Sequence, residues 1–304
     1  MTVLRKLSER LLRFYRLPAR IDTLQEALGR IESRLASPGL ARSLHEREFR
    51  VYSQWGEDGI IDYLVSRVAI ADRSFVEFGV ENYSEANTLF LLKHRHWRGL
   101  VIDGSRDNID SIRAGQVLWR YDLHAECAFI DRDNVNELIS RNGFNGDIGL
   151  LSVDIDGNDY WVWEAIECVR PRIVVSEYNS LFGPRAAIST PYRRDFQRSL
   201  AHRSKMYYGA SIAALTHLAR ERGYSLVGSN SAGNNAFFVR DDCLGDVPAV
   251  QPEQAWVAAA FREARSPEGY VEHLRFEERV AAIAGLPVVD VISGAHLALR
   301  TALA

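Results

Sequence analysis

Short apolar runs alternate with segments of helical spacing from Tyr52 onward, and this alternation limits the possible folds more than any other feature of the chain. Strands without polar alternation are buried on both faces, and strands that alternate with helices form βαβ units. The sequence therefore predicts an α/β fold with a mostly parallel, Rossmann-like sheet. The apolar runs are Ser74–Phe78, Gly99–Ile102, Ala125–Ile130, Ile148–Val153 and Arg172–Ser176. The helical stretches are Glu85–Lys93, Asp107–Ala114, Asp133–Arg141 and Trp161–Cys168.

The part of the chain that follows predicts an antiparallel addition to this sheet. Ser211–Arg222 has the pattern of a helix, with Gly223 as its C-terminal cap. Two further apolar runs, Tyr224–Gly228 and Asn235–Arg240, are separated by Ser, Asn, Ala and Gly. Because residues of these types form turns, the two runs are expected to pair as an antiparallel hairpin.

Residues 1–38 are expected to form a separate helical segment ahead of the sheet. Apolar residues in it recur in steps of four and three, as in the a/d seam of a coiled coil. A coiled coil makes the protein a homo-oligomer, but an amphipathic helix lying on the core explains the same spacing. The apolar residues are Leu17, Ile21, Leu24, Leu28, Ile31 and Leu35.

Residues 1–16 place several basic side chains among leucines. A cationic amphipathic helix here suits either contact with a membrane surface or packing on protein. Ser37-Pro38-Gly39 is typical of a linker and separates the first two of three expected parts of the chain. We expect the helical segment at 1–38, the sheet domain at 39–245, and a helical or irregular tail at 246–304.

Composition narrows the classes of partner and the location. A net charge of −3 provides no basic field for nucleic acid. The three cysteines are scattered and form no CxxC pair, which fits a reducing cytoplasm and no disulfide framework. No apolar run approaches the ~20 residues that span a membrane, and no signal peptide is recognisable. A cytoplasmic protein is expected, peripheral at the inner membrane surface if residues 1–16 bind lipid.

Acidic residues follow the first two predicted strands. The first strand contains Glu77 and leads into Gly79, Glu81 and Asn82. Ligands of doubly wound sheets bind at the carboxyl ends of the strands, and a glycine there lets a ligand approach the backbone. The second strand ends in Asp103-Gly104, where an acid can accept both hydroxyls of a ribose.

The first turn lacks the GxGxxG loop that holds a pyrophosphate in NAD enzymes. The carboxylate of Glu81 in this turn repels a pyrophosphate but suits a cationic ligand such as a sulfonium. After the third strand, Asp131 has two interpretations: it accepts the exocyclic amine of an adenine beside Ile130, or it caps the next helix.

The densest acidic segment is Asp154-Ile155-Asp156-Gly157-Asn158-Asp159, directly after the fourth apolar run. Acids this close together need a cation or hydrogen-bond donors. Three interpretations remain open. The acids border the methionine end of a cofactor and the substrate; they bind a divalent metal such as Mg²⁺ through Asp154, Asp156 and Glu177; or they form the DxD motif of a glycosyltransferase that holds Mn²⁺ and a nucleotide sugar.

Several of these segments together resemble a bacterial branch of FkbM-like methyltransferases. The resemblance rests on the runs at 53–60, Val76-Glu77-Phe78-Gly79, 154–159 and 233–240, and it covers about residues 50–245. It implies a class I methyltransferase fold, with the seventh strand inserted antiparallel. It also implies S-adenosylmethionine as methyl donor and an oxygen acceptor, often a sugar or glycan hydroxyl. The turn 156–160 is similar to a metal-binding turn of macrocin-type sugar O-methyltransferases, but Asn158 replaces an acid there.

Methyl transfer to a hydroxyl requires in-line positioning and removal of a proton. Asp154 or Asp156 is the expected base, acting directly or through a metal, and His202 is an alternative. Gln54, Glu57 and Asp58 precede the first strand, and they are expected either to fold over the cofactor as a lid or to cap the N-terminus of a helix. Two other classes of function remain open: a metal-dependent glycosyltransferase, and a non-catalytic scaffold on a methyltransferase fold.

Overall fold

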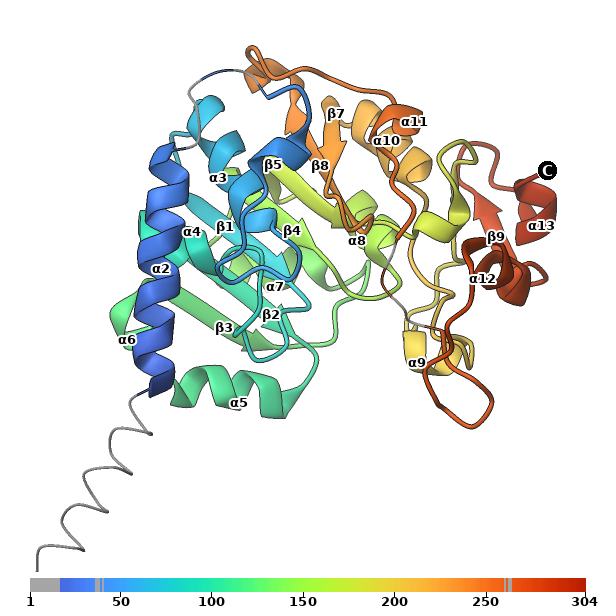
Figure 1. Cartoon of the computed structure of the whole chain (residues 1–304), viewed down its shortest axis with the longest axis horizontal. Helices are drawn as coiled ribbons and strands as arrows, with labels where there is room; N and C mark the ends of the chain where they lie inside the picture. The colour runs from blue at the N-terminus through green and yellow to red at the C-terminus, as the bar shows by residue number, and fades with distance from the viewer. Residues whose placement is uncertain (1–16, 36–38, 40, 260, 262–263) are drawn as a thin grey trace, which may run out of the picture.

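A computed structural model describes residues 17–35, 39, 41–259, 261 and 264–304. Its centre is a seven-stranded sheet in the order β3-β2-β1-β4-β5-β8-β7 (Figure 1). The strands are β1 (Ser74–Phe78), β2 (Arg98–Asp103), β3 (Leu123–Cys127), β4 (Gly146–Val153), β5 (Val169–Glu177), β7 (Tyr224–Ser229) and β8 (Asn235–Arg240).

The sheet is parallel except for one strand. β8 runs antiparallel to both of its neighbours, β5 and β7, and every other pairing is parallel. The predicted α/β class and the predicted hairpin are therefore confirmed. The insertion of an antiparallel strand beside β5 is the arrangement expected of the Rossmann-like class I methyltransferase sheet.

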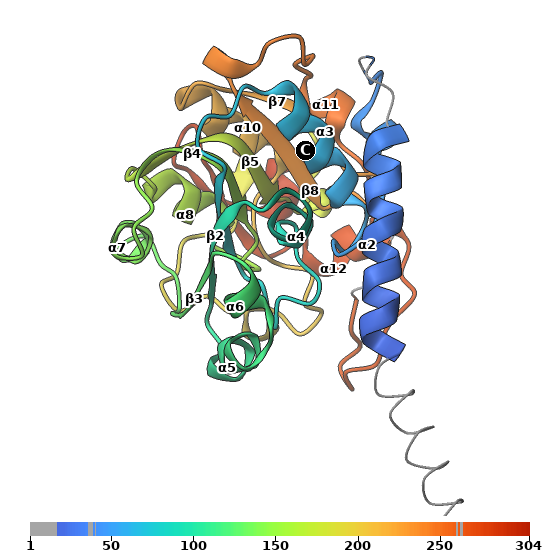
Figure 2. The same ribbon diagram turned by 90° about the vertical axis from the view of Figure 1, so that its left-hand side faces the viewer.

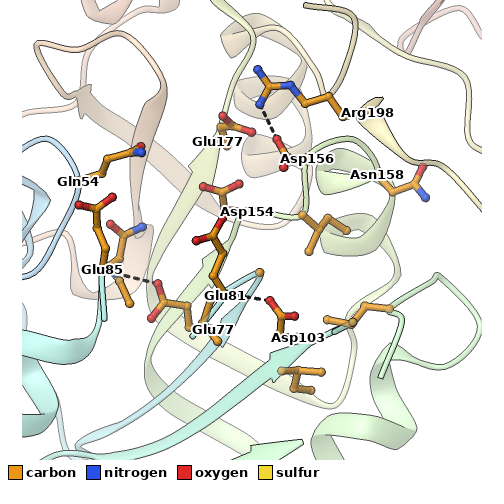
Figure 3. Close-up of a pocket in the computed structure, with 18 of the residues that line it drawn as sticks. Gln54, Glu77, Glu81, Glu85, Asp103, Asp154, Asp156, Asn158, Glu177 and Arg198 are labelled. Carbon is orange, nitrogen blue, oxygen red and sulfur yellow. Dashed lines mark hydrogen bonds and ion pairs between the residues drawn. The ribbon is translucent and has the colours of Figure 1, made fainter. Parts of the chain in front are cut away.

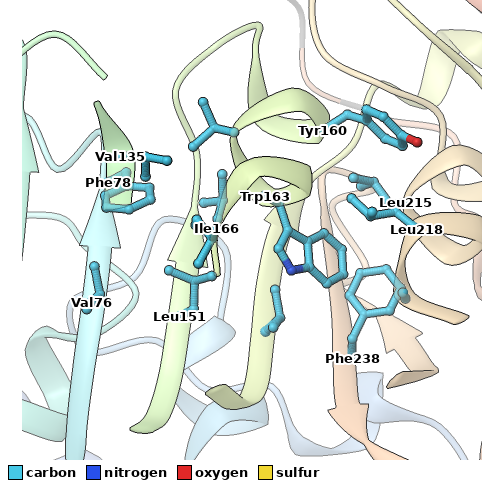
Figure 4. Close-up of a cluster of buried hydrophobic side chains, with 14 of the residues drawn as sticks. Val76, Phe78, Val135, Leu151, Tyr160, Trp163, Ile166, Leu215, Leu218 and Phe238 are labelled. Atoms are coloured by element: carbon cyan, nitrogen blue, oxygen red, sulfur yellow. The ribbon is translucent and has the colours of Figure 1, made fainter. Parts of the chain in front are cut away.

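Helices cover both faces of the sheet because side chains that are adjacent along each strand point to opposite faces. Val76 and Phe78 face one layer of helices, while Phe75 faces the other. The first layer holds α7 (Val135–Arg141), α8 (Asp159–Ala165) and α10 (Ile212–Glu221), and Trp163 of α8 is at its centre (Figure 4). The second layer holds α3 (Glu57–Arg67), α4 (Leu89–Arg95), α5 (Arg106–Ala114) and the single-turn helix α6 (Val117–Arg120).

The predicted heptad segment is a continuous helix, α2 (Leu17–Leu35), which lies outside the second layer (Figure 2). Its apolar seam does not lie on the core. Residues 1–16, predicted to contact a membrane surface or to pack on protein, are outside the described residues, as are Ser37 and Pro38 of the predicted linker. In the part of the chain that the structure describes, no helix is long and apolar enough to cross a membrane.

The tail differs from its predicted helical or irregular character. It contains α11 (Pro252–Ala255), α12 (Phe276–Ile283) and α13 (Leu299–Ala302), but also β9 (Pro287–Asp290) and β10 (His296–Ala298). These two strands form a second sheet with β6 (Ile188–Ser189). Strands this short show too few alternating positions to be recognised from sequence.

The long segment between β5 and α10 is mostly irregular, as predicted, and contains only β6, α9 (Arg198–Ala201) and the 3-10 turn η2 (Ser180–Phe182). Two further 3-10 turns, η1 (Leu44–Arg47) and η3 (Asp241–Cys243), complete the described elements. The segment carries the residues around Phe196 and Arg198 back over the carboxyl ends of β4 and β5, where the main cavity lies.

Candidate functional site

A cavity of about 470 Å³ lies at the carboxyl ends of β1, β2, β4 and β5 (Figure 3). Parallel strands end at one edge of a sheet, so the acids that follow them converge there. Most of the residues predicted from sequence line this cavity: Gln54, Glu77, Gly79, Glu81, Asp103, Gly104, Asp154, Asp156 and Glu177.

The glycine at the tip of β1 has a structural role in addition to the predicted one. Gly79 has a φ of +73°, and a Cβ at this position would overlap the carbonyl oxygen of Asp154. Its N–H donates to the carbonyl of Ile102 at 3.0 Å. The glycine therefore lets the tips of β1 and β4 approach each other, and the approach of a ligand stays a prediction.

Glu77 organises the loop that follows β1. Its carboxylate accepts hydrogen bonds from the backbone N–H of Asn87 at 2.9 Å, the N–H of Thr88 at 3.1 Å and the Thr88 hydroxyl. Burial raises the pKa of Glu77 to about 7, although these hydrogen bonds oppose the shift. The side chain fixes residues 79–88 along one wall of the cavity.

Asp103 lies at the tip of β2 and has capacity to accept one further hydrogen bond. One oxygen accepts from the N–H of Ser105 at 2.8 Å and from the amide of Asn108 at 3.0 Å. The other accepts only the N–H of Glu81, at 2.9 Å. A carboxylate offers about four acceptor positions, so one remains open among the described residues, and Asp103 lines the cavity. This geometry suits a ribose hydroxyl.

The tip of β3 contributes apolar contacts in place of the predicted acid. Phe129, 48% exposed, and Ile130 line the cavity, while Asp131 does not. Asp131 accepts the N–H groups of Asp133 and Asn134, and pairs with Arg194 at 2.7 Å. It is therefore the capping residue of the alternative interpretation.

Two other predicted residues also lie outside the cavity. Asn82 is exposed and accepts hydrogen bonds from the N–H and hydroxyl of Ser84, as is common in a polar turn. His202 contacts the hydroxyl of Ser204 at 2.7 Å, and partial burial lowers its pKa. Neither lines the 470 Å³ cavity.

The carboxylates of the acidic turn after β4 have different roles: one holds the turn together, and others lie at the cavity. Asp159 accepts the N–H groups of Ile155 and Gly157, both at 2.8 Å, and holds the turn together. Asp156 has a φ of +57° and pairs with Arg198 at 2.5 Å. Asp154 points into the cavity (Figure 3).

Asp154, Asp159 and Glu177 each place one oxygen within 4.8 Å of the others. Burial, followed by the neighbouring carboxylates, raises the pKa of both Asp154 and Glu177 well above the ordinary range. This trio differs from the predicted metal set, because Asp159 takes the place that Asp156 was expected to fill.

Three buried acceptor oxygens at this end of the cavity have no hydrogen-bond donor in the described residues. They belong to Glu177 (Oε2), Asn158 (Oδ1) and Asn235 (Oδ1), all of which line the cavity. The amide nitrogen of Asn235 donates to Glu57 at 2.9 Å, which fixes the orientation of the amide while its oxygen remains without a donor. Leaving such atoms unpaired costs about 1–3 kcal/mol each, so a donor-rich ligand is expected here.

The cavity is strongly acidic. Among the described residues its lining has one basic side chain, Arg198, against the seven carboxylates of Glu77, Glu81, Glu85, Asp103, Asp154, Asp156 and Glu177. Such a lining favours a cation and disfavours a diphosphate.

Aromatic residues also line the cavity. Trp55 stacks on Phe261 with ring centroids 5.7 Å apart, and both line the cavity beside Gln54. Asp58 holds this loop by accepting the N–H groups of residues 51–53 at 2.6–2.8 Å. Burial raises the pKa of Asp58 to about 6.

A second cavity of about 490 Å³ adjoins the first and shares its wall at Ile155, Asp156 and Arg198, among others. Its further lining includes Lys205 and Arg265. Phe196, Arg198 and Phe261 also line the first cavity, although the sequence did not predict them as site residues. They follow no strand and belong to no motif, so only the folded chain brings them to the cavity.

No protein-family model matches the chain, and no curated protein matches it. Among solved structures, the chain is similar to an O-methyltransferase family protein from Burkholderia thailandensis, at 14% identity and a TM-score of 0.37 over 60% of this chain and 58% of that one. It is similar to an S-adenosylmethionine-dependent methyltransferase from Clostridium acetobutylicum, at 9% identity and a TM-score of 0.39 over 60% and 90%. PKMT2 from Rickettsia typhi, solved with AdoHcy, gives 9% identity and a TM-score of 0.42 over 64% and 55%.

At these identities the likeness concerns architecture alone. The strand order and the single antiparallel strand place the fold in the Rossmann-like class I methyltransferase class. The chain spans little more than half the length of the Burkholderia protein.

Proposed function

We propose that this chain is an S-adenosylmethionine-dependent O-methyltransferase. The observation that carries the proposal is the unpaired acceptor cluster of Glu177, Asn158 and Asn235 in an acidic cavity that also offers a ribose site at Asp103. S-adenosylmethionine is a nucleoside with a sulfonium and an ammonium group. It therefore supplies the positive charge and the donors that one end of the cavity lacks, and the ribose that the other end accepts.

In this proposal each end of the cavity binds a different part of the cofactor. Asp103 accepts the ribose hydroxyls, and the exposed ring of Phe129 packs on the adenine with Ile130. Asp154 and Glu177 face the sulfonium and the amino-acid end. A bound cation stabilises both carboxylates in their charged form and so reverses the rise in their pKa values.

The acceptor is proposed to enter through the adjoining 490 Å³ cavity, whose shared wall at Ile155 and Asp156 leads to the donor site. Asp154 is the preferred base, because Asp156 is already paired with Arg198. In the second cavity Phe129 and Phe196 offer faces for a sugar ring, and Lys205 and Arg265 offer hydrogen-bond donors to its hydroxyls.

We further propose that the chain is FkbM-like and that its acceptor is a sugar or glycan hydroxyl. Three segments that carry the resemblance lie at the cavity: the loop at Gln54, the strand end at Glu77 and Gly79, and the turn at Asp154. Residues 233–240 contribute Asn234 and Asn235 to its lining.

A divalent metal such as Mg²⁺ is the alternative to the cofactor's ammonium group at Glu177, where Asp154 and Asp159 complete a trio of carboxylates. Each presents a hard oxygen ligand, and the Glu177 Oε2 atom has no other partner among the described residues. A metal held there would act as a Lewis acid on the acceptor oxygen. Metal-dependent binding is measurable separately from turnover by calorimetric titration of Mg²⁺ into the wild type and Glu177→Gln.

Calorimetry with S-adenosylmethionine and S-adenosylhomocysteine tests the proposal. We expect both to bind, and Asp103→Ala to weaken binding about 10- to 100-fold, because a hydrogen bond to a charged group contributes about 1.5–3 kcal/mol. Asp103→Asn keeps one acceptor oxygen and is expected to fall between the two.

Asp131→Ala is the matched control, because this acid follows the neighbouring strand β3 but does not line the cavity. Its affinity should equal that of the wild type, with circular dichroism confirming that each variant is folded. Binding of a nucleotide sugar that requires Mn²⁺, with no affinity for S-adenosylmethionine, would identify a glycosyltransferase instead. Affinity for neither ligand would identify a scaffold.

A further inference from the structure

The apolar seam of α2 is exposed along the whole helix, and the helix itself lies at the outside of the molecule (Figure 2). Its side chains are between 47% and 73% exposed, and they follow one another in steps of four and three along the helix: Leu17, Ile21, Leu24, Leu28, Ile31 and Leu35. A contiguous stripe of large apolar side chains in water marks an interaction surface.

The opposite face of α2 anchors the helix to the domain. Asp22 pairs with Lys93 at 3.2 Å, and the hydroxyl of Ser33 donates to Asp62 at 2.6 Å. Between these contacts Gly29 lies against Phe90, and a Cβ at this position would overlap that ring. The helix therefore cannot rotate to bury its seam on its own domain without breaking polar contacts and placing larger side chains where Gly29 fits.

We infer that α2 packs along this seam against α2 of a second copy of this chain, as a short parallel two-stranded coiled coil. The spacing assigns Ile21, Leu28 and Leu35 to position a, and Leu17, Leu24 and Ile31 to position d. A seam of this kind is self-complementary, since each a or d side chain inserts between four residues of an identical helix.

The residues that flank the seam support a two-stranded assembly. Positions e and g include Arg20, Gln25, Glu32 and Arg34, which are polar. A larger bundle would bury these side chains, whereas a pair of helices leaves them at its edge. The outer positions of α2 are occupied by its own domain, which leaves only the seam open.

Charge favours the parallel orientation and a protein partner. In a parallel pair Arg20 lies opposite Gln25, and Ala27 lies opposite Glu32, without repulsion. An antiparallel pair brings Arg20 of one helix beside Arg34 of the other. α2 carries three basic residues, Arg20, Arg30 and Arg34, and three acidic ones, Asp22, Glu26 and Glu32. Helices that bind anionic membranes have an excess of basic residues, which α2 lacks.

Sedimentation velocity of the full chain tests this inference. The wild type should sediment as a dimer of the 34.4 kDa chain, and the double variant Leu24→Glu, Leu28→Glu as a monomer. Thr23→Glu is the matched control, because it adds a charge to an exposed position of the same helix outside the seam, and it should remain dimeric. Thermal unfolding of the double variant should stay near that of the wild type, which separates lost association from lost folding.

A wild type that is monomeric above about 100 µM, or a dimer that persists in the double variant, would overturn the inference. Leu24→Cys tests the orientation: a parallel pair cross-links this position to itself on oxidation, and the wild type with its own cysteines is the control. Wild-type protein that is monomeric and binds vesicles of anionic lipid through the seam would replace the second copy with a membrane surface.

Discussion

Replacing Gly79 by alanine tests how the site is assembled, because this glycine allows the close contact between the tips of β1 and β4. The residue has a φ of +73°, and an added Cβ would overlap the carbonyl oxygen of Asp154. That oxygen belongs to the backbone of a central strand end, so it cannot move without displacing the Asp154 side chain from the cavity.

The expected change in the free energy of unfolding combines two destabilising effects and one stabilising effect. A left-handed conformation costs a residue with a Cβ about 1–2 kcal/mol. Overpacking against the backbone adds about 1–3 kcal/mol. Alanine also reduces the conformational entropy of the unfolded chain, which stabilises the fold by about 0.4–1 kcal/mol. Gly79→Ala should therefore destabilise the fold by about 1–5 kcal/mol and lower its melting temperature by roughly 2–8 °C.

Thermal unfolding followed by circular dichroism measures this effect. Gly104→Ala is the matched control, because Gly104 also lines the cavity at a strand tip, but its added Cβ would meet nothing closer than 3.6 Å. Its stability should stay within about 1 kcal/mol of the wild type. Equal melting temperatures for the two variants would refute the argument that β1 and β4 require a glycine where they meet.

Three further predictions concern the chemistry of the cavity. Phe129→Ala should weaken S-adenosylmethionine binding about tenfold in calorimetry, while Phe129→Tyr keeps the ring and the affinity; unchanged affinity in both would remove the aromatic ring from the binding site. Burial raises the pKa of Asp58 and Asp159 to about 6 and that of Glu77 to about 7. The folded state therefore holds protons that the unfolded chain releases, so the stability these groups contribute is complete below about pH 4 and is lost as the pH rises through 6 to 7; denaturant titrations from pH 5 to 8 measure it, and rising stability over that range would contradict it. Glu177→Gln should stabilise the protein without ligand by about 1–3 kcal/mol at pH 8, because it neutralises a buried unpaired acid, and should weaken cofactor binding; a destabilised variant with normal affinity would contradict this role.

The sheet could be predicted from the sequence because its strands are buried on both faces. Ser74–Phe78 and Asn235–Arg240 have the predicted bounds, since apolar runs end where the chain reaches water. The third strand ends at Cys127, three residues before its predicted end. Ala128 and Phe129 are apolar because they border the cavity, and a periodicity argument cannot separate that reason from burial in a sheet.

The site was predictable where it follows strand tips and unpredictable where it depends on contacts distant in the chain. Glu77, Asp103 and Asp154 converge because parallel strands end at one edge. Asp131 follows the same rule, but Arg194, 63 residues later, pairs with it. Arg198 and Phe261 reach the cavity from irregular segments, whose paths are set by packing and not by a local pattern.

The function of the cavity is tested most directly by a crystal structure of this chain with S-adenosylhomocysteine. We expect the ribose hydroxyls to bind Asp103, the adenine to pack against Phe129, and the amino-acid end to lie beside Glu177 and Asn235. The three unpaired oxygens then gain hydrogen-bond donors. Density for the nucleoside at any other place on the molecule, or a cavity that stays filled with water at saturating ligand, would contradict it.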